Sequence, residues 1–202
     1  MTRSSVTGKL PRALGSAALA AALAAGLAGW SVPSAAAATN VNTAAAATAA
    51  TLQNWPELRQ GSNSAWPKVT VRSLQYLLNA HGAKLTVDGV FGPKTKAAVV
   101  TFQKARGLSG SGVVQAPTWR ALLVTVQRGS AGPAVRAVQD QINFRNLKDG
   151  RTLVVDGQFG PKTDTSVRAF QKAMAAEVSG FRVDGVVGPQ TWQALVTEAL
   201  SG

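Results

Sequence analysis

Two copies of a 21-residue segment decide the fold: LTVDGVFGPKTKAAVVTFQKA at residues 85–105 and LVVDGQFGPKTDTSVRAFQKA at residues 153–173. They are identical at 14 of 21 positions, at a constant offset of 68. The similarity continues outward, since residues 58–62 parallel residues 126–130 and Trp119 parallels Trp192. A period of this length indicates a chain built from two repeats of roughly 65–70 residues.

A shorter pattern recurs inside each repeat. Asp-Gly followed by Gly-Pro-x-Thr begins at Asp88, Asp156 and Asp184, and a degraded copy begins at Ser111. Asp-Gly predicts a tight turn, because Gly adopts positive φ without strain and Asp bonds nearby backbone amides. Gly-Pro predicts a helix start, because proline at the first helical position loses no intrahelical hydrogen bond.

Apolar residues recur at helical spacing in three segments of each repeat. In the first repeat, the predicted inward faces of the three helices are Val71, Leu74 and Leu78; Ala98, Phe102 and Ala105, flanked by Val99; and Trp119, Leu122 and Leu123. In the second repeat, they are Val135, Val138 and Ile142; Ser166, Phe170 and Ala173, flanked by Val167; and Trp192, Leu195 and Val196. The sequence therefore predicts an all-α protein with two tandem three-helix domains, at residues 55–124 and 125–202. An Asp-Gly turn precedes the second and third helix of each.

The first 38 residues have the layout of a secretory signal peptide. Arg3, Lys9 and Arg12 form a positive region, residues 13–29 are uncharged and rich in Ala and Leu, and small residues lead to a predicted cleavage after Ala38. A membrane helix is the alternative, but 17 weakly apolar residues are short for a bilayer. We expect a secreted protein, extracellular or associated with the cell wall, with no membrane contact after cleavage.

Residues 39–54 carry no charge and no apolar period, which predicts a flexible Ala/Thr-rich leader. After removal of the signal, 18 basic and 9 acidic side chains remain, a net charge of +9. Such a charge favours an anionic partner. The basic residues are dispersed and few aromatic residues lie among them, so a nucleic-acid partner is not expected.

The composition argues against catalysis. The chain has no Cys and one His, which excludes disulfides, a Cys nucleophile and a metal site built on several His side chains. His81 precedes Gly82 at a predicted helix C-terminus, where it interacts with the helix dipole. The Asp residues of the turns are explained by turn chemistry, and no Ser–His–Asp motif is present. We expect no enzyme activity, no metal and no cofactor.

The run D-G-x-F-G-P-K-T, followed by V-x-x-F-Q-K, resembles the peptidoglycan-binding domain family, a small three-helix module found beside bacterial cell-wall enzymes. L-R-Q-G-S at residues 58–62 and G-P-Q-T-W-Q-A-L at residues 188–195 are also similar to it. The resemblance covers about residues 56–197. The degraded turn departs from the pattern, since Ser111 replaces Asp and Gln115-Ala116 replaces Gly-Pro.

The resemblance implies non-covalent binding to cell-wall peptidoglycan, with anionic wall polymers as further candidate partners. A signal and leader before the two modules leave no room for an enzyme domain. The implied contact residues lie in the turns and on the second helix of each module: Asp88, Phe91, Lys94, Thr95, Gln103, Lys104, Asp156, Phe159, Lys162, Thr163, Gln171 and Lys172.

Several of these residues have a plainer interpretation. The lysines fit a solvated helix face, and Phe91 and Phe159 fit the core better than a sugar-stacking role. Trp55, Trp66 and Tyr76 lie outside the shared pattern, and either sugar stacking or covering a module edge would explain them. The alternative functions are an accessory or fragment of a cell-wall hydrolase, and an interaction module that has lost wall binding.

Overall fold

The computed structural model describes residues 52, 54–62, 68–145 and 153–197. The predicted signal peptide lies outside the described residues, as does the leader except for Leu52 and Asn54. Leu52 is half-buried and packs against the core.

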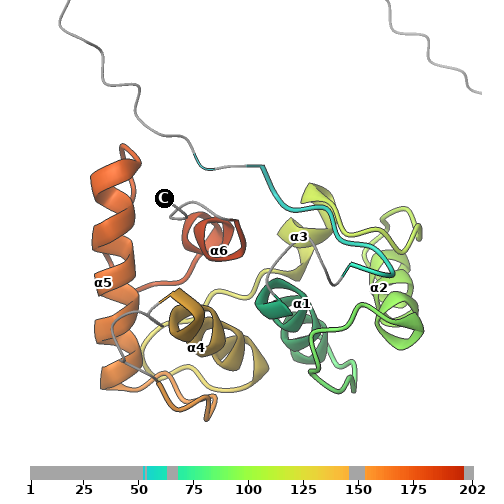
Figure 1. Ribbon diagram of the computed structural model, residues 1–202, viewed down its shortest axis with the longest axis horizontal. Helices are drawn as coiled ribbons and strands as arrows, with labels where there is room; N and C mark the ends of the chain where they lie inside the picture. The colour runs from blue at the N-terminus through green and yellow to red at the C-terminus, as the bar shows by residue number, and fades with distance from the viewer. Residues whose placement is uncertain (1–51, 53, 63–67, 146–152, 198–202) are drawn as a thin grey trace, which may run out of the picture. The chain divides into compact units, whose positions relative to one another are not determined.

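The described residues form six helices and no strand, which confirms the all-α prediction (Figure 1). The helices are α1 (Lys68–Ala80), α2 (Pro93–Ala105), α3 (Ala116–Leu122), α4 (Pro133–Arg145), α5 (Pro161–Glu177) and α6 (Pro189–Val196). We call α1–α3 with its flanking segments the first module and α4–α6 with its flanking segments the second.

The predicted helix starts are confirmed. Gly92, Gly160 and Gly188 are the N-cap residues of α2, α5 and α6, and proline follows each directly. α1 ends at Ala80 before Gly82, whose φ of 92° permits the amide of Ala83 to bond the carbonyl of Leu78.

The inward face predicted for the second helix of each module is confirmed at the Phe and at the flanking Val, and is wrong at the Ala residues. Val99 and Phe102 are buried on α2, whereas Ala98 is only partly buried and Ala105 is exposed. α5 shows the same burial pattern, with Val167 and Phe170 buried and Ala173 exposed. The predicted faces left out residues that the structure buries, including polar Thr and Gln residues that periodicity does not count as core.

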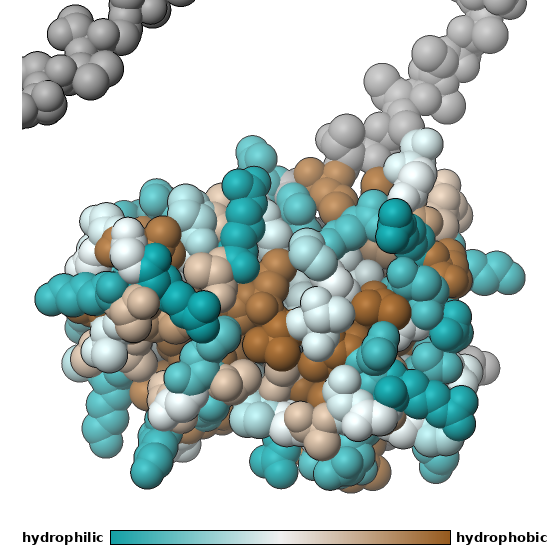
Figure 2. Space-filling model, turned by 180° about the vertical axis from the view of Figure 1, so that it is seen from behind, coloured by the Kyte–Doolittle hydropathy of each residue, from teal (hydrophilic) through white to brown (hydrophobic). Residues whose placement is uncertain are grey.

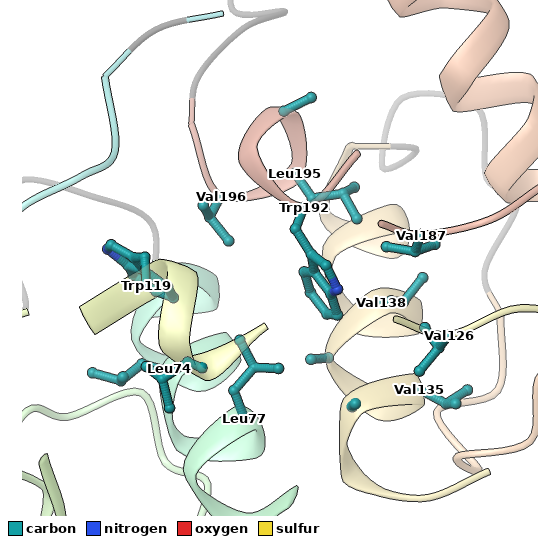
Figure 3. Packing of buried hydrophobic residues seen from close by; sticks show 14 of the residues in the cluster. Leu74, Leu77, Trp119, Val126, Val135, Val138, Val187, Trp192, Leu195 and Val196 are labelled. Atoms are coloured by element: carbon teal, nitrogen blue, oxygen red, sulfur yellow. The ribbon is translucent and has the colours of Figure 1, made fainter. Parts of the chain in front are cut away.

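A buried tryptophan lies at the centre of each module. Trp119 of α3 packs near Leu74 of α1, and Trp192 of α6 lies against α4 near Val138 (Figure 3). Each indole N–H donates to a backbone carbonyl of the segment that precedes the module's first helix, at 2.7 Å to Pro56 and 2.8 Å to Val124. The tryptophans therefore attach these extended segments to the helices.

α1 and α4 pack against each other and join the two modules (Figure 1). The guanidinium of Arg72 donates to the Asp140 carboxylate at 2.6 and 2.9 Å, and Gln141 donates to the Ser73 hydroxyl at 2.9 Å. Leu77 is fully buried. The Asp140 hydrogen bond raises the pKa of Arg72, and burial raises the pKa of Tyr76.

The charged and polar residues at the α1–α4 contact occupy equivalent places in the two repeats. Alignment of Val71 with Val135 makes Arg72 equivalent to Arg136, and Tyr76 equivalent to Asp140. Arg72 pairs with Asp140, and Arg136 lies close enough to Tyr76 to oppose the rise in its pKa. Each module thus offers the same helix face to the other, as in an isologous dimer.

Arg72→Ala tests this packing. The Asp140 side chain, 15% exposed, would lose its charged partner, and we expect the free energy of unfolding to fall by about 1–3 kcal/mol in denaturant titration. Arg59→Ala is the matched control, because its contact with Glu57 spans 3.9 Å at the surface. Equal effects of the two substitutions would contradict a packed α1–α4 interface.

Candidate functional site

A buried glutamine of α1 organises the first Asp-Gly turn. Gln75 is 1% exposed, and its amide nitrogen lies 2.8 Å from the Asp88 carboxylate, 3.1 Å from the Val90 carbonyl and 3.2 Å from the Thr95 hydroxyl. Its amide oxygen accepts from the backbone N–H groups of Asp88 and Gly89, at 3.1 and 2.9 Å. One side chain thus holds the turn and the first turn of α2 together.

Three more turns repeat this arrangement with different helices. The anchoring glutamines are buried in α2, α4 and α5. Gln103 bonds Gly112, Val113 and Thr118; Gln139 bonds Asp156, Gly157, Gln158 and Thr163; Gln171 bonds Asp184, Gly185, Val186 and Thr191. We call the four units the Gln-anchored turns.

Each Gln-anchored turn has a glycine with positive φ at the same place. The φ angles are 75° at Gly89, 72° at Gly112, 79° at Gly157 and 74° at Gly185. A side chain is strained in this region, so the Gly of each Asp-Gly pair is required by the backbone. The degraded turn keeps the geometry because the Ser111 hydroxyl accepts from the Val113 amide at 3.2 Å, much as Asp88 accepts from the Val90 amide.

The carboxylates of Asp88 and Asp156 are stabilised in their charged form. The pKa of Asp88 is lowered mainly by its hydrogen bond from Gln75 and then by the Val90 amide. The pKa of Asp156 is lowered mainly by the Gln158 amide and then by Gln139. These carboxylates carry structural hydrogen bonds at the protein surface.

The structure divides the predicted contact residues into two groups. Eight have their side chains in the core or in the Gln-anchored turns: Asp88, Phe91, Thr95, Gln103, Asp156, Phe159, Thr163 and Gln171. The other four, Lys94, Lys104, Lys162 and Lys172, are exposed. The two Phe side chains are 1% and 2% exposed, so they fill the core as the plainer interpretation expects.

One groove brings three of the predicted residues together. Asp88, Lys94 and Thr95 line a cavity of about 500 Å³ beside the first Gln-anchored turn, and Lys84 and Leu85 also line it. A cavity of this size suits a small ligand. Lys84 and Lys94 are both exposed, so the groove presents two ammonium groups to an anionic group of a ligand.

A second groove of about 430 Å³ lies between the end of α1 and α2. Leu78, Ala98 and Phe102 give it apolar walls. His81 at its side bonds the Leu122 carbonyl through Nε2 at 3.0 Å and the Arg106 guanidinium through Nδ1 at 3.0 Å. His81 therefore joins α1 to α3, beyond its predicted interaction with the helix C-terminus.

Sequence reasoning missed Gln75, Gln139 and Lys84 as parts of this site. The glutamines occupy equivalent places in both repeats, one residue after a core leucine or valine. The sequence signal for these glutamines is a polar residue that recurs inside the apolar face of the first helix in both repeats. Lys84 directly precedes the repeated segment, but Thr152 stands at its place in the second repeat, so recurrence does not single it out and only the folded chain places it beside Lys94.

The described residues contain no group of three or more His, Asp or Glu placed to hold a metal ion. Among them there is also no helix long and apolar enough to cross a lipid bilayer. Figure 2 shows charged and polar side chains projecting around a more apolar centre on one face.

Comparison with known proteins gives a family match in both modules. The family described as "Putative peptidoglycan binding domain" matches residues 68–122 and 131–195. The chain is 38% identical over 71 residues to a zinc D-Ala-D-Ala carboxypeptidase of Streptomyces albus G, which covers 35% of this chain and 26% of that protein. It is 26% identical over 144 residues to the N-acetylmuramoyl-L-alanine amidase CwlL of Bacillus licheniformis, which covers 69% of this chain and 38% of the amidase.

The chain thus spans less than half the length of these two relatives. No solved structure gives a significant match.

Gln75→Leu tests the anchoring role of the glutamine. The substitution keeps the side chain's approximate size but leaves the buried Gly89 amide without its acceptor, and the Val90 carbonyl keeps only the Thr95 hydroxyl as a side-chain donor. We expect a loss of about 3 kcal/mol in the free energy of unfolding. The control is Gln127→Leu, at an exposed site, with an expected change of about 0.5 kcal/mol. A loss at Gln75 no larger than the control would contradict the anchoring role.

The lowered pKa values of Asp88 and Asp156 predict a pH-dependent stability. A carboxylate whose pKa is lowered by folding stabilises the protein above its unfolded pKa of about 4, and this contribution is lost as the pH falls through the lowered folded value. In thermal melts, Asp88→Asn/Asp156→Asn should therefore be less stable than the wild type at neutral pH. The melting temperatures of the variant and the wild type should converge as the pH falls into the acid range. A difference in melting temperature that stays constant at every pH would contradict the assignment.

Proposed function

We propose that this chain, which belongs to the peptidoglycan-binding domain family, is a secreted, non-catalytic protein that binds bacterial cell-wall peptidoglycan through two tandem modules. The family match in both modules carries the proposal. The groove beside the first Gln-anchored turn, lined by Lys84 and Lys94, supports it. The named relatives, an amidase and a carboxypeptidase, have names that refer to cell-wall chemistry.

The groove beside the first Gln-anchored turn supports recognition of the peptide part of peptidoglycan. Stem peptides carry carboxylates and amide groups. Lys84 and Lys94 supply positive charge at the groove, while the Thr86 and Leu85 side offers polar and apolar contacts. The net charge of +9 after the predicted removal of the signal peptide would also attract anionic wall polymers.

The packing of α1 on α4 supports joint binding by the two modules. When two binding modules are held on one chain, the second contact becomes intramolecular and the overall affinity rises without new contacts. An interface with a buried leucine and a bidentate Arg72–Asp140 pair fixes the spacing of the modules better than a flexible linker would.

The use of the acidic side chains supports a non-catalytic role. Asp88, Asp156 and Asp184 hold Gln-anchored turns, and Asp140 and Asp164 pair with arginines. A hydrolase of glycosidic bonds needs two carboxylates beside one bond. These carboxylates instead belong to different turns and helices, and each has a structural partner.

A second candidate is a targeting part of a cell-wall hydrolase. It is favoured by the relatives, which are named as hydrolases and extend well beyond the region matched by this chain. Both candidate functions include binding to the cell wall, and only the second is linked to hydrolase activity. A zymogram on purified cell walls separates the two, because a clear zone of lysis would overturn the non-catalytic assignment.

Co-sedimentation with purified insoluble sacculi tests wall binding. The chain 39–202 is mixed with intact sacculi, with sacculi stripped of teichoic acid, and with cellulose, at low and high salt. We expect saturable binding to stripped sacculi that survives salt. Binding that disappears on stripping or in salt would reduce the function to electrostatic adhesion, and no binding at all would contradict the proposal.

Lys84→Ala/Lys94→Ala tests the groove in the same assay. We expect at least a fivefold weaker affinity, because both ammonium groups at the groove are lost. Arg128→Ala/Arg182→Ala removes the same charge from exposed sites outside the groove and should change the affinity less than twofold. Equal weakening by both double variants would show that net charge, and not the groove, governs binding.

A further inference from the structure

A third groove, of about 580 Å³, is formed by both modules together. Trp55, Arg120 and Leu123 line it from the first module and its end, and Thr125, Pro189 and Gln190 line it from the second. Figure 1 shows the segment that carries Trp55 passing toward α3. Because α6 supplies one wall, a single module cannot form this groove.

Trp55 is held with its ring in a fixed orientation. Its ring stacks on Trp119, with 6.1 Å between ring centroids and 22° between planes, and the residue is only half-buried. The neighbouring Pro56 carbonyl accepts from the Trp119 indole at 2.7 Å, which fixes the backbone there. The indole therefore lines the groove as a rigid, flat, apolar surface.

Covering the module edge does not require an aromatic residue. Leu123, before α4, is the equivalent of Trp55, before α1. The two residues are related by the same offset of 68 that relates Leu58 to Val126. The second module thus uses an aliphatic side chain where the first uses a tryptophan. This favours the sugar-stacking role for Trp55 over the role of a simple edge cover.

Polar groups lie around this apolar surface. Gln190 is positioned by the preceding loop, since its amide oxygen accepts from the Arg182 amide at 3.2 Å and its amide nitrogen donates to the Gly180 carbonyl at 3.3 Å. A second proton on that nitrogen and a second lone pair on that oxygen remain for a ligand. Arg120 is exposed and makes no hydrogen bond or ion pair with the described residues.

We propose that this groove between the modules binds the glycan strand of peptidoglycan, as a β-linked chain of N-acetylated hexosamines. The inference rests on the proposed function and assigns a second part of the same polymer to a second site. The C–H face of a pyranose ring stacks on the Trp55 indole, and its hydroxyl groups bond Gln190, Thr125 and Arg120.

The lining favours an N-acetylated sugar over a plain glucan or a peptide. An acetamido group has one donor, one acceptor and a methyl group. The Gln190 amide offers a matching acceptor and donor, and Leu123 and Pro189 offer apolar contact for the methyl. Among the residues that the structure describes, one guanidinium and no carboxylate line the groove, which suits an uncharged or weakly anionic strand.

Binding of soluble oligosaccharides to the chain 39–202 tests the proposal. The probes are chitotetraose and cellotetraose, titrated while the indole N–H resonance of Trp55 is followed by NMR. We expect a saturable shift with chitotetraose and at least a tenfold weaker response to cellotetraose. Equal responses to both sugars, or no shift with either, would overturn the assignment.

Variants at the groove give a second readout. Trp55→Ala should weaken chitotetraose and sacculus binding at least tenfold, and Trp55→Phe should restore part of the binding by restoring a flat ring. Arg120→Ala should weaken binding severalfold, with Arg128→Ala as the control that loses the same charge. Thermal melts of each variant establish that it is folded.

The two proposals fail in different ways. Sacculus binding that is unaffected by Trp55→Ala, together with no chitotetraose shift, overturns the glycan site and leaves the wall-binding function intact. Absence of wild-type binding to sacculi overturns the proposed function itself, and with it the physiological meaning of the groove.

Discussion

The rest of this structure depends on a buried amide. A glutamine side chain inside an apolar helix face is costly unless every donor and acceptor is satisfied. In the Gln-anchored turns those partners are the backbone groups of an Asp-Gly turn and the Thr of the next helix, so the amide places each helix relative to the next. Small modules with little core gain much of their specificity from such a satisfied network.

The buried glutamine also explains why the turn residues are the same in the two modules. Asp, Gly and Thr recur in both modules because Gln75 and Gln139 need them as hydrogen-bond partners. The modules differ in their candidate binding residues at positions where the network imposes no constraint. Lys84 beside Lys94, and Trp55 where the second module has Leu123, are such positions.

Much of the fold could be predicted from the sequence, because Asp-Gly, Gly-Pro and helical periodicity are local signals. On α2 the prediction was right for Phe102 and Val99 but incomplete, since polar Thr95 and Gln103 also belong to the core and a count of apolar residues overlooks them. The site was predicted only in part: recurrence identifies the turns but does not separate structural from ligand-facing residues. The α1–α4 interface and the groove between the modules depend on tertiary contacts such as Arg72–Asp140, which no local pattern encodes.

Peptidoglycan is the ligand that we propose for the grooves set by the turns and by the packing of the modules. The most direct test is to map the contact of a soluble peptidoglycan fragment, a disaccharide carrying its stem peptide, on the amide spectrum of the isotope-labelled chain. We predict saturable shifts at Lys84 and Lys94 for the peptide and at Trp55 and Gln190 for the glycan. Shifts confined to other surfaces, or none at saturating ligand, would contradict the account.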